Sequence, residues 1–115
     1  MGLGRWWITH GPGSPGSVAK VMARSYTRIK NAYPAMAQSD LLFMTLRTRY
    51  SEYKLDETAV VRMIEESQGK LANLIVQVIH LEIPAATGAM INAPSVYLEM
   101  LDVVDEVVSR YAPST

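Results

Sequence analysis

The stretch from Asp56 to Ile83 constrains the fold of this chain most strongly, because no proline interrupts it and its apolar residues follow one helical stripe. Residues on the stripe recur at alternating steps of four and three, as on one face of an α-helix: Val60, Ile64, Ser67, Leu71, Leu74, Val78 and Leu81. Asp56 suits the N-cap, because its short carboxylate can accept hydrogen bonds from the free amides of the first turn. Pro84 marks the end, since helices rarely continue into the residue before a proline. The pattern predicts one long helix of about 40 Å.

The second half of this stretch is apolar on more than one side. Residues 71–83 are rich in β-branched side chains, so a buried strand would look similar. Gly69 also weakens a continuous helix, by up to about 1 kcal/mol relative to alanine. We favour a continuous helix because no second strand is evident to pair with it. A helix that is apolar almost all round needs cover on several sides, and a second copy of the chain is the simplest cover. The sequence therefore predicts self-association, with a dimer favoured, through Leu74, Ile75, Val78 and Ile79.

Caps and prolines predict three further helices. Ser14 and Pro15 form an N-cap and N1 pair, Ser39 can cap a second helix, and Pro94 opens a last one. These helices are expected over about 15–33, 40–53 and 94–112, with a loop over 84–93. The predicted fold class is all-α: one small four-helix bundle-like domain over residues 15–115, built around one long central helix.

Residues 1–14 are predicted to form an irregular, flexible arm. Glycine and proline resist both helix and strand, and they crowd the segment GPGSPG that begins at Gly11. Trp6 and Trp7 place two large apolar side chains on this arm. They either fold back onto the bundle or contact a partner, and folding back is the more frequent outcome because a tryptophan has a large apolar area to bury.

The composition narrows the class of protein. A chain of 115 residues suffices for one domain with a modest core. It has no cysteine, which excludes disulfides, thiolate zinc sites and cysteine nucleophiles, and which is compatible with a reducing cytoplasm. No uncharged apolar run approaches the roughly 20 residues of a membrane span. We therefore expect a cytoplasmic protein that does not enter a membrane.

The charges are divided unevenly along the chain. Residues 1–54 carry eight Lys or Arg and two acids, whereas residues 55–115 carry three and nine. Lys20, Arg24 and Arg28 lie four apart and form one exposed row on the first helix, the basic ridge. Glu99, Asp102 and Glu106 form an acidic ridge on the last helix. Either the two halves neutralise each other, within a chain or between chains, or the basic ridge binds an acidic partner.

No motif in the sequence requires a cofactor, a metal or a catalytic reaction. His10 and His80 lack ligands at helical spacing, and Ser17 follows Gly16 where a Walker loop requires lysine. The glycine-rich segment before a helix could still hold a phosphate, with Lys20 within reach. Asn73, Gln77 and His80 share one helix face, where they either form a polar seam that fixes helix register or are simply solvated.

These observations predict a non-catalytic interaction module that self-associates and binds a protein partner through its arm or its basic ridge. A first alternative is a nucleic-acid-binding protein, in which the basic ridge contacts phosphates and Trp6 and Trp7 stack on unpaired bases. A second alternative is a small-ligand or phosphate-binding protein with its site under the glycine-rich arm.

Overall fold

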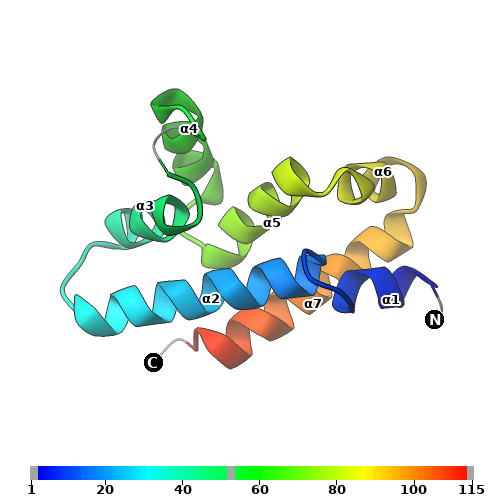
Figure 1. Ribbon diagram of the computed structural model, residues 1–115, viewed down its shortest axis with the longest axis horizontal. Helices are drawn as coiled ribbons and strands as arrows, with labels where there is room; N and C mark the ends of the chain where they lie inside the picture. The colour runs from blue at the N-terminus through cyan, green and yellow to red at the C-terminus, as the bar shows by residue number, and fades with distance from the viewer. Residues whose placement is uncertain (1–2, 52–53, 114–115) are drawn as a thin grey trace.

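The computed structural model describes residues 3–51 and 54–113, with side chains from Trp6 onward. Every regular element in this part of the chain is an α-helix, which confirms the all-α prediction. The helices are α1 (Leu3–Thr9), α2 (Pro15–Ala32), α3 (Gln38–Arg49), α4 (Glu57–Ser67), α5 (Leu71–Glu82), α6 (Pro84–Asn92) and α7 (Pro94–Tyr111) (Figure 1).

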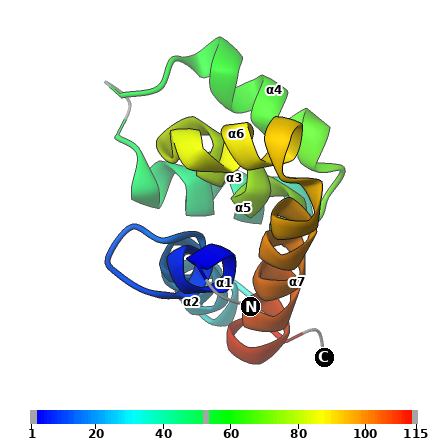
Figure 2. The ribbon, with the colours of Figure 1, turned by 90° about the vertical axis from the view of Figure 1, so that its right-hand side faces the viewer.

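The helices form two layers around one core. In the lower layer of Figure 1, α2 and α7 lie along each other and α1 packs against both. In the upper layer, α3 and α5 pack on α2, while α4 packs on α5 and α3 (Figure 2). α6 leaves α5 at an angle of 103° and leads back to α7.

α5 is the central helix of this arrangement. It contacts α2, α4, α6 and α7. It also supplies four of the largest fully buried side chains, more than any other helix. The largest fully buried side chains are Ile8, Val18, Met22, Leu42, Leu46, Val60, Leu74, Ile75, Val78, Ile79, Met100 and Val104. Residues 71–82 are thus helical, which excludes the strand that the same composition would also suit.

The prediction of one continuous helix over residues 56–83 is wrong at its middle. The predicted N-cap is confirmed, since the Asp56 carboxylate accepts a hydrogen bond from the first turn of α4. The helix ends at Gln68, which has φ 55° and is followed by Gly69 with φ 76°. Gly69 adopts this left-handed conformation without a Cβ clash, so the residue expected only to weaken the helix ends it. The side-chain amide of Gln38 donates to the Gly69 carbonyl (2.9 Å) and holds this turn against α3.

The predicted irregular arm is partly helical. Residues 3–9 form α1, and Ile8 is completely buried in the core. Gly16 permits this packing, because a Cβ there would lie 3.1 Å from the Ile8 carbonyl oxygen. The glycine-rich turn after α1 contains Gly11 and Gly13, both with positive φ. The sequence pattern missed α1 because seven residues are too few to establish a helical period.

The predicted loop over residues 84–93 is also wrong, because Pro84 starts α6 instead of ending helical structure. Proline is favoured at the first position of a helix, where its missing N–H has no partner to lose. Pro84 therefore stops α5 and begins α6 in a new direction. The prediction of four helices is wrong as well. It lacks α1 and α6 and does not divide the long helix at Gly69, and the described residues form seven helices. The second predicted helix begins at Gln38, with Ala37 at its N-cap, so the prediction that Ser39 caps it is wrong, and it ends early at Arg49.

Truncation of Ile8 tests whether α1 is part of the fold. We expect Ile8→Ala to lower the free energy of unfolding by about 2–5 kcal/mol, since it leaves a cavity in the core. Trp6→Ala, on the exposed side of the same helix, should change it by no more than about 0.5 kcal/mol. Urea denaturation followed by circular dichroism measures both. Equal, small effects of the two substitutions would contradict the docking of α1.

Candidate partner-binding surface

The basic ridge lies along α2 and meets the C-terminal end of α7. Arg24 and Arg28 are exposed and Lys20 is half-buried. The Lys20 ammonium lies 5.2 Å and the Arg24 guanidinium 5.0 Å from the centre of the Tyr111 ring. Both distances suit cation–π contacts, which favour charge held over the face of an aromatic ring. The Thr27 hydroxyl donates to the Tyr111 carbonyl (2.7 Å) and fixes the end of α7 against α2.

The positive charge at this place also acts on Tyr111 itself. The Lys20 ammonium, which can hydrogen-bond to the phenol oxygen, lowers the pKa of Tyr111 below its usual value, and Arg110 and Arg24 add to the effect. Nearby cations stabilise the phenolate over the phenol. The surface around Tyr111 therefore favours negative charge.

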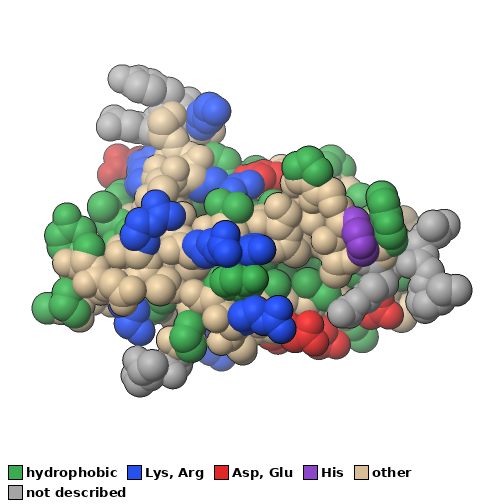
Figure 3. All heavy atoms as spheres, turned by 60° about the horizontal axis from the view of Figure 1, so that its bottom comes forward, with side chains coloured by type: hydrophobic (Ala, Val, Ile, Leu, Met, Phe, Trp, Pro, Cys, Tyr) green, Lys and Arg blue, Asp and Glu red, His purple; other side chains and the backbone are tan. Residues whose placement is uncertain are grey.

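The basic ridge carries no ion pair within the described chain. In residues 3–51 and 54–113 the single ion pair joins Arg49 to Glu82. Neutralisation of the two halves within one chain is thus seen at Arg49 and Glu82, whereas the basic and acidic ridges form no direct pair among the described residues. Asp105 and Glu106 on α7 are exposed and line an open pocket together with Tyr111. Figure 3 shows one face on which Lys and Arg side chains gather over the middle, with Asp and Glu side chains beside them.

The two tryptophans that the sequence groups together are separated by the structure. Trp7 is half-buried and packs against the core, as expected for folding back. Trp6 is 60% exposed and stacks on His10, with ring centres 5.4 Å apart and an interplanar angle of 3°. Of the pair, Trp6 alone presents a large aromatic surface to solvent.

The residues predicted to mediate self-association lie inside the molecule. Leu74, Ile75, Val78 and Ile79 are all 0% exposed, because α2, α4, α6 and α7 already surround α5. The prediction of an interface at these four residues is therefore wrong. Sequence periodicity shows that a helix is apolar on several sides, but it does not show whether the cover comes from the same chain.

The polar residues of α5 act as a seam between helices, which confirms one of the two interpretations of this face. The side-chain amides of Asn73 and Gln77 donate to the carbonyls of Ser67 (3.1 Å) and Met63 (2.9 Å) in α4. His80 is hydrogen-bonded to Thr87 of α6 (3.0 Å) and to Tyr97 of α7 (2.6 Å). Burial lowers the pKa of His80, which favours its neutral form.

The glycine-rich segment is occupied by its own contacts. The Ser14 hydroxyl accepts a hydrogen bond from the Ser17 amide (3.2 Å) at the start of α2. Lys20, which the phosphate-binding alternative places within reach of an anion at this segment, lies over the Tyr111 ring. Within the described residues no three His, Asp or Glu side chains are placed to hold a metal ion. No single described helix is long and apolar enough to cross a membrane, although α5 and α6 together match a bent span by length and composition.

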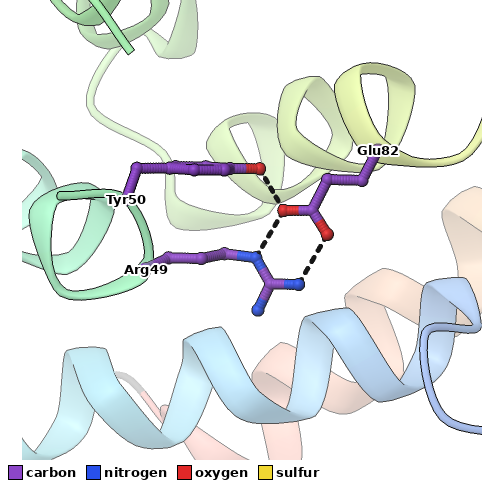
Figure 4. A network of polar contacts seen from close by, with 3 residues as sticks. All are labelled: Arg49, Tyr50 and Glu82. Carbon is purple, nitrogen blue, oxygen red and sulfur yellow. Dashed lines mark hydrogen bonds and ion pairs between the residues drawn. The ribbon is translucent and has the colours of Figure 1, made fainter. Parts of the chain in front are cut away.

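A polar network that the sequence does not indicate joins α3 to the end of α5. Arg49 donates from Nε and Nη2 to the two carboxylate oxygens of Glu82, both at 2.6 Å, and the Tyr50 hydroxyl donates to the same carboxylate (Figure 4). The guanidinium lowers the pKa of Glu82, while burial, together with the neighbouring carboxylate, raises the pKa of Tyr50. Arg49 and Tyr50 are adjacent, but Glu82 lies more than 30 positions further along the sequence, so no local pattern brings it to them.

Comparison with protein-family models, with curated proteins and with solved structures finds no match to this chain. The assignment of a function therefore depends on the surfaces described above.

Glu82 should make the stability of the fold depend on pH. Its pKa in the folded chain is below the unfolded value of 4.5, so its contribution is present in full above pH 4.5 and is lost as the pH falls through the folded pKa. We expect Glu82→Gln to lower the free energy of unfolding at pH 7 by about 1 kcal/mol, a small value because the pair is partly exposed. The difference from the wild type should shrink below pH 4.5.

Urea denaturation between neutral and acidic pH measures this difference. Glu65→Gln is a matched control, because Glu65 is exposed on α4 and forms no ion pair with a described residue. If the two variants show the same pH dependence, the Arg49–Glu82 pair does not stabilise the fold.

Proposed function

We propose that this chain is a non-catalytic interaction module that self-associates and binds a protein partner through charged surface. The observation that carries the proposal is the basic ridge, whose exposed cations have no acid partner in the described chain. A reducing compartment such as the cytoplasm fits a chain without cysteine.

A second copy of the chain supplies the acidic surface that the ridge lacks. α2 and α7 lie along each other, so the cations of one and the acids of the other occupy neighbouring positions, and Tyr111 borders both. In a two-fold dimer each patch meets the complementary patch of the other subunit, because the same surface is used twice. Such an arrangement would pair Arg24 and Arg28 with Asp105 and Glu106 in both directions. It replaces the apolar interface on α5, which is buried.

Trp6 supports binding of a further protein partner. An exposed tryptophan offers a large, rigid apolar surface, and such residues often contribute most to binding at protein interfaces. Trp6 is held by α1, whose Ile8 is anchored in the core, so it pays little conformational entropy on binding. An acidic segment with an apolar residue would match Trp6 and the basic ridge in chemistry.

Nucleic acid is the competing partner for the basic ridge. The same unpaired cations would contact phosphates, which is the observation in its favour. Against it, the Tyr111 ring at this site already lies against Lys20 and Arg24, which leaves less of it for stacking on a base. The acids of α7 would also repel a polyanion.

Charge exchange tests the proposed self-association. One variant carries Arg24→Glu and Arg28→Glu, and the other carries Asp105→Arg and Glu106→Arg. Each variant alone should associate at least about tenfold more weakly than the wild type, because like charges then face each other. An equimolar mixture should recover association, since each variant now complements the other. Sedimentation velocity at low and high salt measures the association, which high salt should weaken.

Two results would contradict the proposal: a wild-type chain that stays monomeric at low salt, or variants that associate as the wild type does. Binding of labelled single-stranded DNA separates the competing function. Under that function the Asp105→Arg, Glu106→Arg variant should bind more tightly than the wild type, because two repelling acids become cations. Under self-association, the wild type should not bind the DNA, and the effect of this variant should instead be weaker association with itself.

A further inference from the structure

A groove between α2, α3 and the end of α5 has the features of a binding site for a small anion. Its volume is about 420 Å³, within the range of small-molecule sites. α2 supplies Val21, Met22 and Ser25, and α3 supplies Thr45 and Thr48. The Arg49–Tyr50–Glu82 network and Lys54 complete its lining.

The groove contains hydrogen-bond donors that the protein does not use. Arg49 engages Glu82 through Nε and Nη2, and Nη1 forms no hydrogen bond with a described residue. In Figure 4 this third nitrogen points away from Glu82, on the side of α2. The Ser25 hydroxyl likewise has no hydrogen-bond partner among the described residues, although its residue is only 8% exposed. No fully buried side-chain nitrogen or oxygen of the described residues lacks a partner, so the unpaired Ser25 hydroxyl oxygen is still reachable from solvent, and its residue lies on the lining of the groove.

The charge balance of the groove favours a negative ligand. Arg49 and Lys54 carry two positive charges, and Glu82 carries one negative charge. The Glu82 carboxylate already accepts hydrogen bonds from Arg49 and Tyr50. Both oxygens of the Glu82 carboxylate are thus occupied by donors, so a ligand meets mainly donors and a net positive charge. Met22 and Val21 supply an apolar wall beside them.

We propose that this groove binds a small ligand with one carboxylate or phosphate group and a short apolar part. The anionic group accepts hydrogen bonds from Arg49 Nη1 and the Ser25 hydroxyl and lies near the Lys54 ammonium. The apolar part packs against Met22 and Val21. Charged donors of this kind give shorter and stronger hydrogen bonds to carboxylate and phosphate than neutral donors do. The site lies away from the glycine-rich segment at the start of α2.

Titration calorimetry of the full chain tests the proposal with three probes of similar size: phenyl phosphate, benzoate and neutral benzyl alcohol. The two anions should bind with a Kd of about 10 mM or tighter, and benzyl alcohol should bind at least about fivefold more weakly. Binding of both anions indicates a site for any small anion, whereas binding of phenyl phosphate alone indicates phosphate.

Two variants assign the binding to this groove without touching the Arg49–Glu82 pair. Lys54→Met should raise the Kd of the bound anion about five- to tenfold, and Ser25→Ala about two- to fivefold. Lys70→Met is the matched control, since Lys70 is exposed at the opposite end of α5 and should leave the Kd unchanged. Circular dichroism checks that each variant is folded. Failure of both anions to bind, equal binding of benzyl alcohol, or a Kd unchanged by both groove variants would overturn the proposal.

Discussion

Burial of α5 is the constraint on which the rest of the structure depends. A helix that is apolar on several sides is stable in water only when other elements cover those sides. Full burial of an aliphatic side chain contributes about 1.5–3 kcal/mol, so the four fully buried residues of α5 supply a large part of the driving force for folding. α2, α4, α6 and α7 pack around it, and the sharp turns at Gly69 and Pro84 allow neighbouring segments to fold back onto it.

The charged groups divide into one pair that joins helices and many that remain at the surface. Arg49 and Glu82 join α3 to α5, where partial burial protects the pair from solvent. The cations of α2 and the acids of α7 lie near each other without direct pairing. They can thus pair with charges of an outside partner without first breaking an internal ion pair. The net charge of the chain is zero because a basic and an acidic part offset each other. This is why we favour self-association over binding of a polyanion.

The sequence predicts local features of this fold better than the relations between distant segments. The caps at Ser14 and Asp56 and the spacing of Lys20 and Arg24 follow from residues close together in the chain, and the structure has them. A glycine inside a helical pattern can be tolerated or, like Gly69, can end the helix in a left-handed conformation. A proline can stop a helix or, like Pro84, can also begin the next one. The residue type alone does not distinguish these roles, which depend on packing. The burial of α5 and the groove beside Arg49 arise from contacts between distant segments, which periodicity does not contain.

The placement of α4 has a consequence for motion within the folded state. The main neighbours of α4 are α5 and α3. Its buried residues are Val60, Met63 and Ser67. It is joined to α5 by a left-handed turn and lies on the outside of the upper layer in Figure 1. A helix with so few buried apolar side chains is a candidate for local opening while α2 and α7 stay packed. Such an opening would uncover one side of α5, so the same hydrophobic helix that organises the fold would become briefly accessible to solvent.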